Sequence, residues 1–201
     1  MHNPLTYQMT EYDCGPTTLV NAINLLFDRE ELSPDILLGI YRYCLDGFNG
    51  NGETGKTGTS HFCMNFMANW FNQYAKQRKL PLKTDFRYQD AVTLDEESDI
   101  RACLRRGGCV LLRCWLSVGH YILLAGIDEE KGVYYVFDPY YLEKPLRRKD
   151  ITFVTDQPKG YNRIISLSRI ASEGHDYYNI GETEKREALL FERTDGRRRA
   201  I

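Results

Sequence analysis

The first third of the chain carries apolar side chains at helical spacing. From Gly15 to Phe27 they recur every three or four residues, with Asp13 as a candidate N-cap and Pro16 in the first turn. This pattern predicts a buried helix that begins at or just after Cys14.

Two more helices follow in the same part of the chain. Ser33 and Pro34 form a start signal for a helix that ends near Asp46, and Thr59 or Ser60 can cap a helix that runs to about residue 77. Between them, residues 47–58 contain five glycines with Asn and Thr between them, a composition typical of a loop.

In the second half of the chain the spacing of apolar residues changes from the helical pattern to one typical of strands. A short helix is expected over residues 95–106, closed by two glycines, and strands are expected over residues 109–116, 120–127, 133–137 and 163–167. An amphipathic helix is predicted around residues 184–191.

These elements predict an α+β fold with residues 1–172 as its main body. Residues 173–201 would be a charged extension of the same domain, since no linker or repeat divides the chain.

The segment DEEKG, which separates the second and third strands, has the length and composition of a hairpin loop. With the loop centred near Glu130, paired positions sum to about 260. Asp138 then lies opposite about Ile122, two residues from His120. The two side chains are therefore expected to lie together.

Composition narrows the function. The 201 residues carry a formal charge of −2, which gives no overall field to attract nucleic acid or an anionic membrane. No run of 18 apolar residues or secretory signal is visible, and the six cysteines are sparse, with no CxxC pair. We therefore expect a cytoplasmic protein with reduced thiols, no membrane span and no nucleic-acid partner.

The context of Cys14 differs from that of the other cysteines. It lies in the first turn of a predicted helix, where free backbone N–H groups and the helix dipole stabilise a thiolate. A carboxylate at Asp138 can accept the Nδ1 proton of His120 and support the imidazolium that forms when His120 takes a proton from Cys14. The side-chain amide of Gln8, with the Cys14 backbone N–H, can donate hydrogen bonds to an oxyanion. The pattern predicts a catalytic site of Cys14, His120, Asp138 and Gln8.

The strings QMTEYDCGPTT, GHYILLAGID and VFDPYY resemble the bacteriocin-processing peptidases that cleave double-glycine leaders, a branch of the papain-like cysteine peptidases. The resemblance spans residues 5–166. It implies a papain-like fold, in which a helical half with Cys14 packs against an antiparallel sheet with His120 and Asp138. It also implies thiolate attack on a peptide or amide bond, a peptide or protein substrate, and a stand-alone form without the transporter part, for which a separate exporter is a candidate partner.

Two other functions use the same residues. A non-catalytic module would keep the papain-like cleft to bind a peptide, and an acyltransferase would pass the acyl group from Cys14 to an amine. The sequence does not separate acyl transfer from hydrolysis.

Two further patterns carry less weight. Residues 50–57, GNGETGKT, fit a phosphate-binding loop, but a helix pattern precedes them where such a loop needs a buried strand. Cys63 and His61 are two apart on a helix and face away from each other, which disfavours zinc. We expect no cofactor and no metal, and we interpret the other five cysteines as packing residues.

Overall fold

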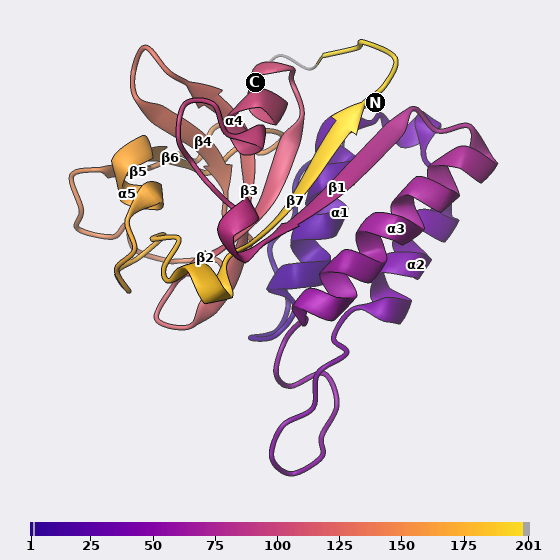
Figure 1. The fold of residues 1–201 in the computed structure, drawn as a ribbon, viewed down its shortest axis with the longest axis horizontal. Helices are drawn as coiled ribbons and strands as arrows, with labels where there is room; N and C mark the ends of the chain where they lie inside the picture. The colour runs from indigo at the N-terminus through magenta and orange to yellow at the C-terminus, as the bar shows by residue number, and fades with distance from the viewer. Residues whose placement is uncertain (2, 199–201) are drawn as a thin grey trace.

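The computed structural model describes residues 1 and 3–198 (Figure 1). Three helices, α1 (Cys14–Leu26), α2 (Pro34–Tyr43) and α3 (His61–Arg78), gather on one side of a sheet. They match the three helices predicted from the apolar spacing. Ser33 and Ser60 cap α2 and α3 as expected, each accepting a backbone N–H of the first turn.

One antiparallel sheet of seven strands forms the rest of the framework, in the order β1-β7-β2-β3-β4-β6-β5. The strands are β1 (Leu82–Tyr88), β2 (Cys109–Trp115), β3 (Gly119–Asp128), β4 (Val133–Phe137), β5 (Ile151–Phe153), β6 (Arg163–Ser166) and β7 (Glu187–Arg193). The shorter helices are α4 (Asp99–Arg105) and α5 (Leu167–Ala171). The predicted α+β class is confirmed.

Each face of the sheet covers its own apolar core. On β2 and β3, Leu111, Tyr121 and Leu123 pack on the side of α1, and the alternate residues Leu112 and Ile122 pack on the side of α4. This alternation follows from the period of two along a strand. It fixes the register that carries the candidate site.

The sequence interpretation was wrong at three places in the sheet. Residues 184–191 form no α-helix, because a short 3-10 helix ends at Lys185 and β7, which lies between β1 and β2, occupies the residues from Glu187 on. Helical and strand spacing are hard to tell apart in a short amphipathic segment, and here pairing with two neighbours decides the outcome. The edge strands β1 and β5 were not predicted, since one is largely polar and the other has three residues.

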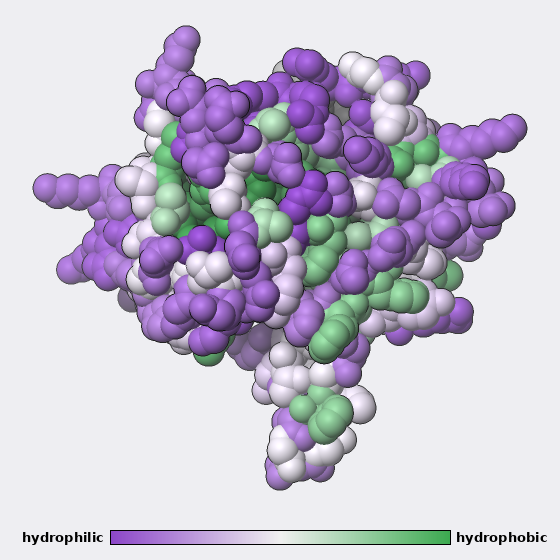
Figure 2. Space-filling view, in the orientation of Figure 1, coloured by the Kyte–Doolittle hydropathy of each residue, from purple (hydrophilic) through white to green (hydrophobic). Residues whose placement is uncertain are grey.

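Residues 47–58 form the expected loop, which projects from the body of the molecule below α2 and α3 in Figure 1. A single antiparallel bridge joins Phe48 to Thr54, and the Phe48 side chain is exposed. Figure 2 shows apolar groups on this loop and beside α3, on a face that is otherwise mostly polar.

The phosphate-loop motif does not have the structure that nucleotide binding requires. The chain enters it from α2 and leaves it into α3, with no strand before it, and Lys56 pairs with Glu53 of the same loop at 2.7 Å. The structure therefore supports the view that this motif is a chance match.

In the part of the chain that the structure describes, no helix is both long and apolar enough to cross a bilayer.

Candidate active site

Cys14 is the first residue of α1 and lies at the wall of a cavity, where the residue is 8% exposed. Asp13 occupies the N-cap position, but its carboxylate does not cap the helix. It accepts hydrogen bonds from the backbone N–H groups of Met9 and Thr10, at 3.1 and 2.8 Å. The first turn of α1 therefore has no side-chain cap, and its positive end faces the cavity side of Cys14.

The β3–β4 hairpin has the predicted register on the side of the site. Leu123 pairs with Phe137 and Leu124 with Val136, so both pairs sum to 260. The strands shift by one residue beyond Leu124, towards the hairpin loop, which leaves the other end unaffected. His120 therefore lies near Asp138, and the distance from its Nε2 atom to Oδ1 of Asp138 is 2.8 Å.

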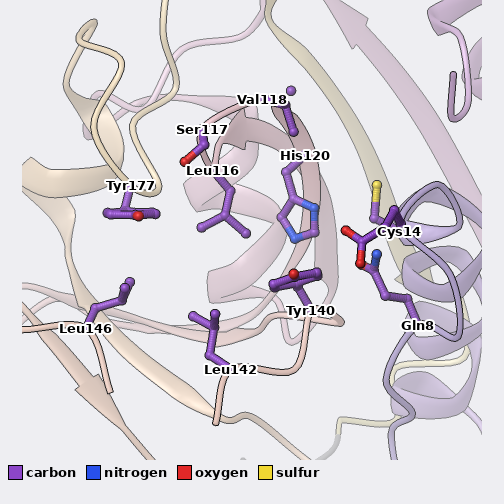
Figure 3. A pocket seen from close by; sticks show the side chains of 12 residues that line it. Gln8, Cys14, Leu116, Ser117, Val118, His120, Tyr140, Leu142, Leu146 and Tyr177 are labelled. Carbon is purple, nitrogen blue, oxygen red and sulfur yellow. The ribbon is translucent and has the colours of Figure 1, made fainter. Parts of the chain in front are cut away.

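The ring nitrogen that meets the carboxylate is Nε2, whereas the sequence interpretation assigned Nδ1. Since Nε2 is engaged by Asp138, Nδ1 is the nitrogen left for Cys14. The sulfur of Cys14 interacts with the His120 ring, and Figure 3 shows the two side chains next to each other at the cavity wall. His120 thus bridges Cys14 and Asp138.

The His120 ring is strongly biased towards its charged form. Burial lowers the pKa of His120, but the charge and the hydrogen bond of Asp138, together with the Cys14 sulfur, outweigh burial and raise the pKa to about 10. At neutral pH the ring therefore holds two protons.

Asp138 is completely buried and receives three hydrogen bonds at its carboxylate. Burial raises its pKa, but the His120 charge and hydrogen bond and the Tyr178 hydroxyl lower it more. The Tyr178 hydroxyl donates to Oδ2 at 2.6 Å, and the backbone N–H of Tyr140 donates to Oδ1 at 2.8 Å. The carboxylate is thereby held ionised and in one orientation.

Asn162 and Arg163 complete the support of Asp138. The Asn162 amide accepts from the Asp138 backbone N–H and donates to its carbonyl, both at 2.8 Å. The buried guanidinium of Arg163 donates to the Asn162 carbonyl at 2.8 Å and lowers the pKa of Asp138 by its charge. Sequence reasoning missed Asn162, Arg163 and Tyr178, because no local pattern links them to the hairpin.

Gln8 lies beside Cys14 in the cavity wall (Figure 3). Its backbone N–H donates to the Pro139 carbonyl at 2.9 Å, which ties the N-terminal segment to the residues after Asp138. One hydrogen of its side-chain amide donates to the Thr10 carbonyl at 2.7 Å. The amide has a second hydrogen, which is the donor that an oxyanion would use.

The other cysteines are buried and lie outside the cavity wall. Burial raises the pKa of Cys103 to about 12 and that of Cys109 and Cys114 well above the ordinary value. Cys44 and Cys63 contact each other, with their sulfurs 3.9 Å apart. Within the described residues, no group of three His, Cys, Asp or Glu side chains is arranged to hold a metal ion.

Comparison with protein-family models identifies a family. The sequence model described as "Peptidase_C39 like family" matches residues 2–166, a range that includes all four predicted site residues. No curated protein matches the chain.

Proposed function

Because the chain belongs to the peptidase C39-like family, we propose that it is a cysteine peptidase with Cys14 as the nucleophile. The observation that carries this proposal is the position of His120, which joins the Cys14 sulfur to the buried carboxylate of Asp138. A ring that keeps both protons at neutral pH stabilises a thiolate beside it. A thiolate is the form of cysteine that attacks a carbonyl.

In this proposal the Cys14 sulfur attacks the carbonyl carbon of the scissile bond. The oxyanion accepts hydrogen bonds from the Cys14 backbone N–H and from the second hydrogen of the Gln8 amide. His120 passes its Nδ1 proton to the leaving nitrogen, the C–N bond breaks, and a thioester remains on Cys14. Water then attacks the thioester, gives a proton to Nδ1, and releases the acid and the thiolate.

Asp138 keeps its charge throughout and orients the ring through Nε2. Tyr178 and Asn162 act as positioning residues, because they contact Asp138 and not the reacting atoms. The resemblance to double-glycine leader peptidases makes a peptide that ends in Gly-Gly the first acyl segment to test. We propose the cytoplasm as compartment and a separate exporter as partner on that same resemblance and on the six free thiols.

The test combines labelling with turnover. Iodoacetamide at low stoichiometry should alkylate Cys14 before the other cysteines, and the rate should fall in His120→Gln. A peptide library should yield cleavage that Cys14→Ala abolishes and the matched variant Cys103→Ala retains. Equal labelling of all six thiols, or cleavage by Cys14→Ala, would overturn the proposal. Capture of the acyl group by an added amine in preference to water would instead identify an acyltransferase.

A further inference from the structure

A cavity of about 330 Å³ opens beside His120, and most of its lining is apolar. Beyond the residues that carry the proposed chemistry, its main walls are Leu116, Tyr140, Leu142, Leu146 and Tyr177. Figure 3 shows these five side chains around a hollow on the side of His120 that faces away from Cys14 and Gln8. None of residues 47–58 contributes to it.

This hollow lies on the side of the site where the leaving segment of the substrate would lie. In the proposed mechanism the acyl carbon bonds to the Cys14 sulfur, and the leaving nitrogen must lie within reach of His120, which protonates it. The acyl segment therefore stays with Cys14, while the leaving segment runs past His120. The walls beyond His120 are the first surface that the leaving segment meets.

We propose that this cavity is the subsite for the first residue of the leaving segment and that it takes a large apolar side chain such as Leu or Phe. The inference rests on the proposed function. A cavity of this size is at the lower end of the range for ligand pockets, so it suits one large side chain better than an extended segment.

Charge on the lining supports the same selection. Glu11 is the one acidic side chain on the cavity wall, and no Lys or Arg lines the cavity among the described residues. The one cation on the wall is the His120 ring, whose charge is already paired with Asp138, so an acidic leaving residue would enter the cavity without a free cationic partner and with Glu11 on the same wall. An Asp at this position should therefore be the poorest substrate.

The experiment uses peptides that share the acyl segment found in the library and differ only in the leaving residue, which is Leu, Phe, Gly or Asp. The methyl ester of the same acyl segment has no leaving side chain and serves as the reference. We expect kcat/KM for Leu and Phe to exceed that for Gly by about tenfold or more, because only the large side chains bury apolar surface in the cavity. Asp should fall below Gly.

Variants then test the cavity itself. Leu142→Ala should lower the ratio of Leu to Gly peptide turnover by about tenfold, with a much smaller loss on the methyl ester. Leu38→Ala, which trims an exposed leucine outside the cavity, is the matched control and should leave the ratio unchanged.

The outcomes separate this inference from the function on which it rests. Turnover without preference for the leaving residue, or an equal loss on ester and peptide in Leu142→Ala, would overturn the subsite alone. Absence of turnover of every peptide and of the ester would overturn the proposed peptidase function.

Discussion

Nε2 of His120 lies 2.8 Å from Oδ1 of Asp138, and both side chains are buried. The contact joins the end of β4 to the start of β3, so the hairpin register sets it directly. The carboxylate outweighs the cost of burying a charged ring and keeps His120 protonated at neutral pH.

Asp138→Asn tests this relationship. The amide oxygen still accepts the Nε2 proton, but its charge is gone, so the pKa of His120 should fall. We expect kcat/KM to drop by about a hundredfold or more, and the alkaline limb of its pH profile to move to lower pH. The measurement is a pH profile of peptide turnover with the alkylation rate of Cys14 beside it. An unchanged alkaline limb would contradict the assigned role of Asp138.

The free energy of unfolding should also depend on the protonation of His120 and should fall as the pH rises. Its pKa of about 10 in the fold exceeds the ordinary value of 6.5, so the protonated ring stabilises the folded chain fully below pH 6.5. This contribution is lost as the pH rises from about 6.5 to about 10. Urea unfolding of the wild type and His120→Gln should therefore show a difference that shrinks over this range. A constant difference would show that the ring does not retain its proton.

Tyr178→Phe removes the hydroxyl that donates to Oδ2 of Asp138. We expect the unfolding free energy at neutral pH to fall by about 1–3 kcal/mol, because a buried carboxylate loses a hydrogen bond. The pKa of Asp138, which the hydroxyl lowers, should rise. Its stabilising contribution, present above the ordinary value of 3.8 and lost at lower pH, should then disappear at a higher pH than in the wild type.

The matched control is Tyr135→Phe, which removes a 3.2 Å bond to the carboxylate of Asp128 at the edge of the hairpin. It should have a smaller effect on stability and none on the pH profile of turnover. Equal effects of the two variants would argue against a positioning role for Tyr178.

Gly15→Ala tests why a glycine follows Cys14. A Cβ atom there would lie 2.5 Å from the Thr59 hydroxyl oxygen and 2.9 Å from its Cβ, so Thr59 must move. Overpacking of this kind costs about 1–3 kcal/mol, and the displaced helix start should also lower the alkylation rate of Cys14. Gly50→Ala, which meets no atom within 4 Å, is the control. If Gly15→Ala and Gly50→Ala show the same thermal unfolding and the same labelling of Cys14, the close packing of Gly15 against Thr59 is not needed for stability or for thiol reactivity.

Truncation tests the contribution of β7, the central strand whose apolar spacing predicts a helix. A stop after Arg186 deletes β7 and leaves the facing edges of β1 and β2 without a hydrogen-bonding partner, so we expect the loss of cooperative unfolding. A stop after Asp195 retains β7, so this longer chain should still unfold cooperatively. Circular dichroism during thermal unfolding distinguishes the two chains. Cooperative unfolding of the shorter chain would show that β7 adds little to the fold.

The sequence by itself determined the helix that presents Cys14, the two strands that present His120 and Asp138, and the pairing that brings these last two together. Each of these depends on local spacing and on a short hairpin loop, so the information lies within a few residues. The sequence did not determine which ring nitrogen of His120, Nε2 or Nδ1, meets Asp138, because the orientation of the ring depends on every group packed around the imidazole.

Only the tertiary structure decided what surrounds the carboxylate and what lies beyond the histidine. The Tyr178 hydroxyl donates to Asp138, and Arg163 acts on Asp138 through its charge, both from segments with no pattern in common with the hairpin. Residues 187–193 form a strand because they pair with both β1 and β2. The cavity likewise combines side chains from four separate loops with the starts of α1 and β3. Such contacts depend on long-range packing, which the local spacing of residues does not encode.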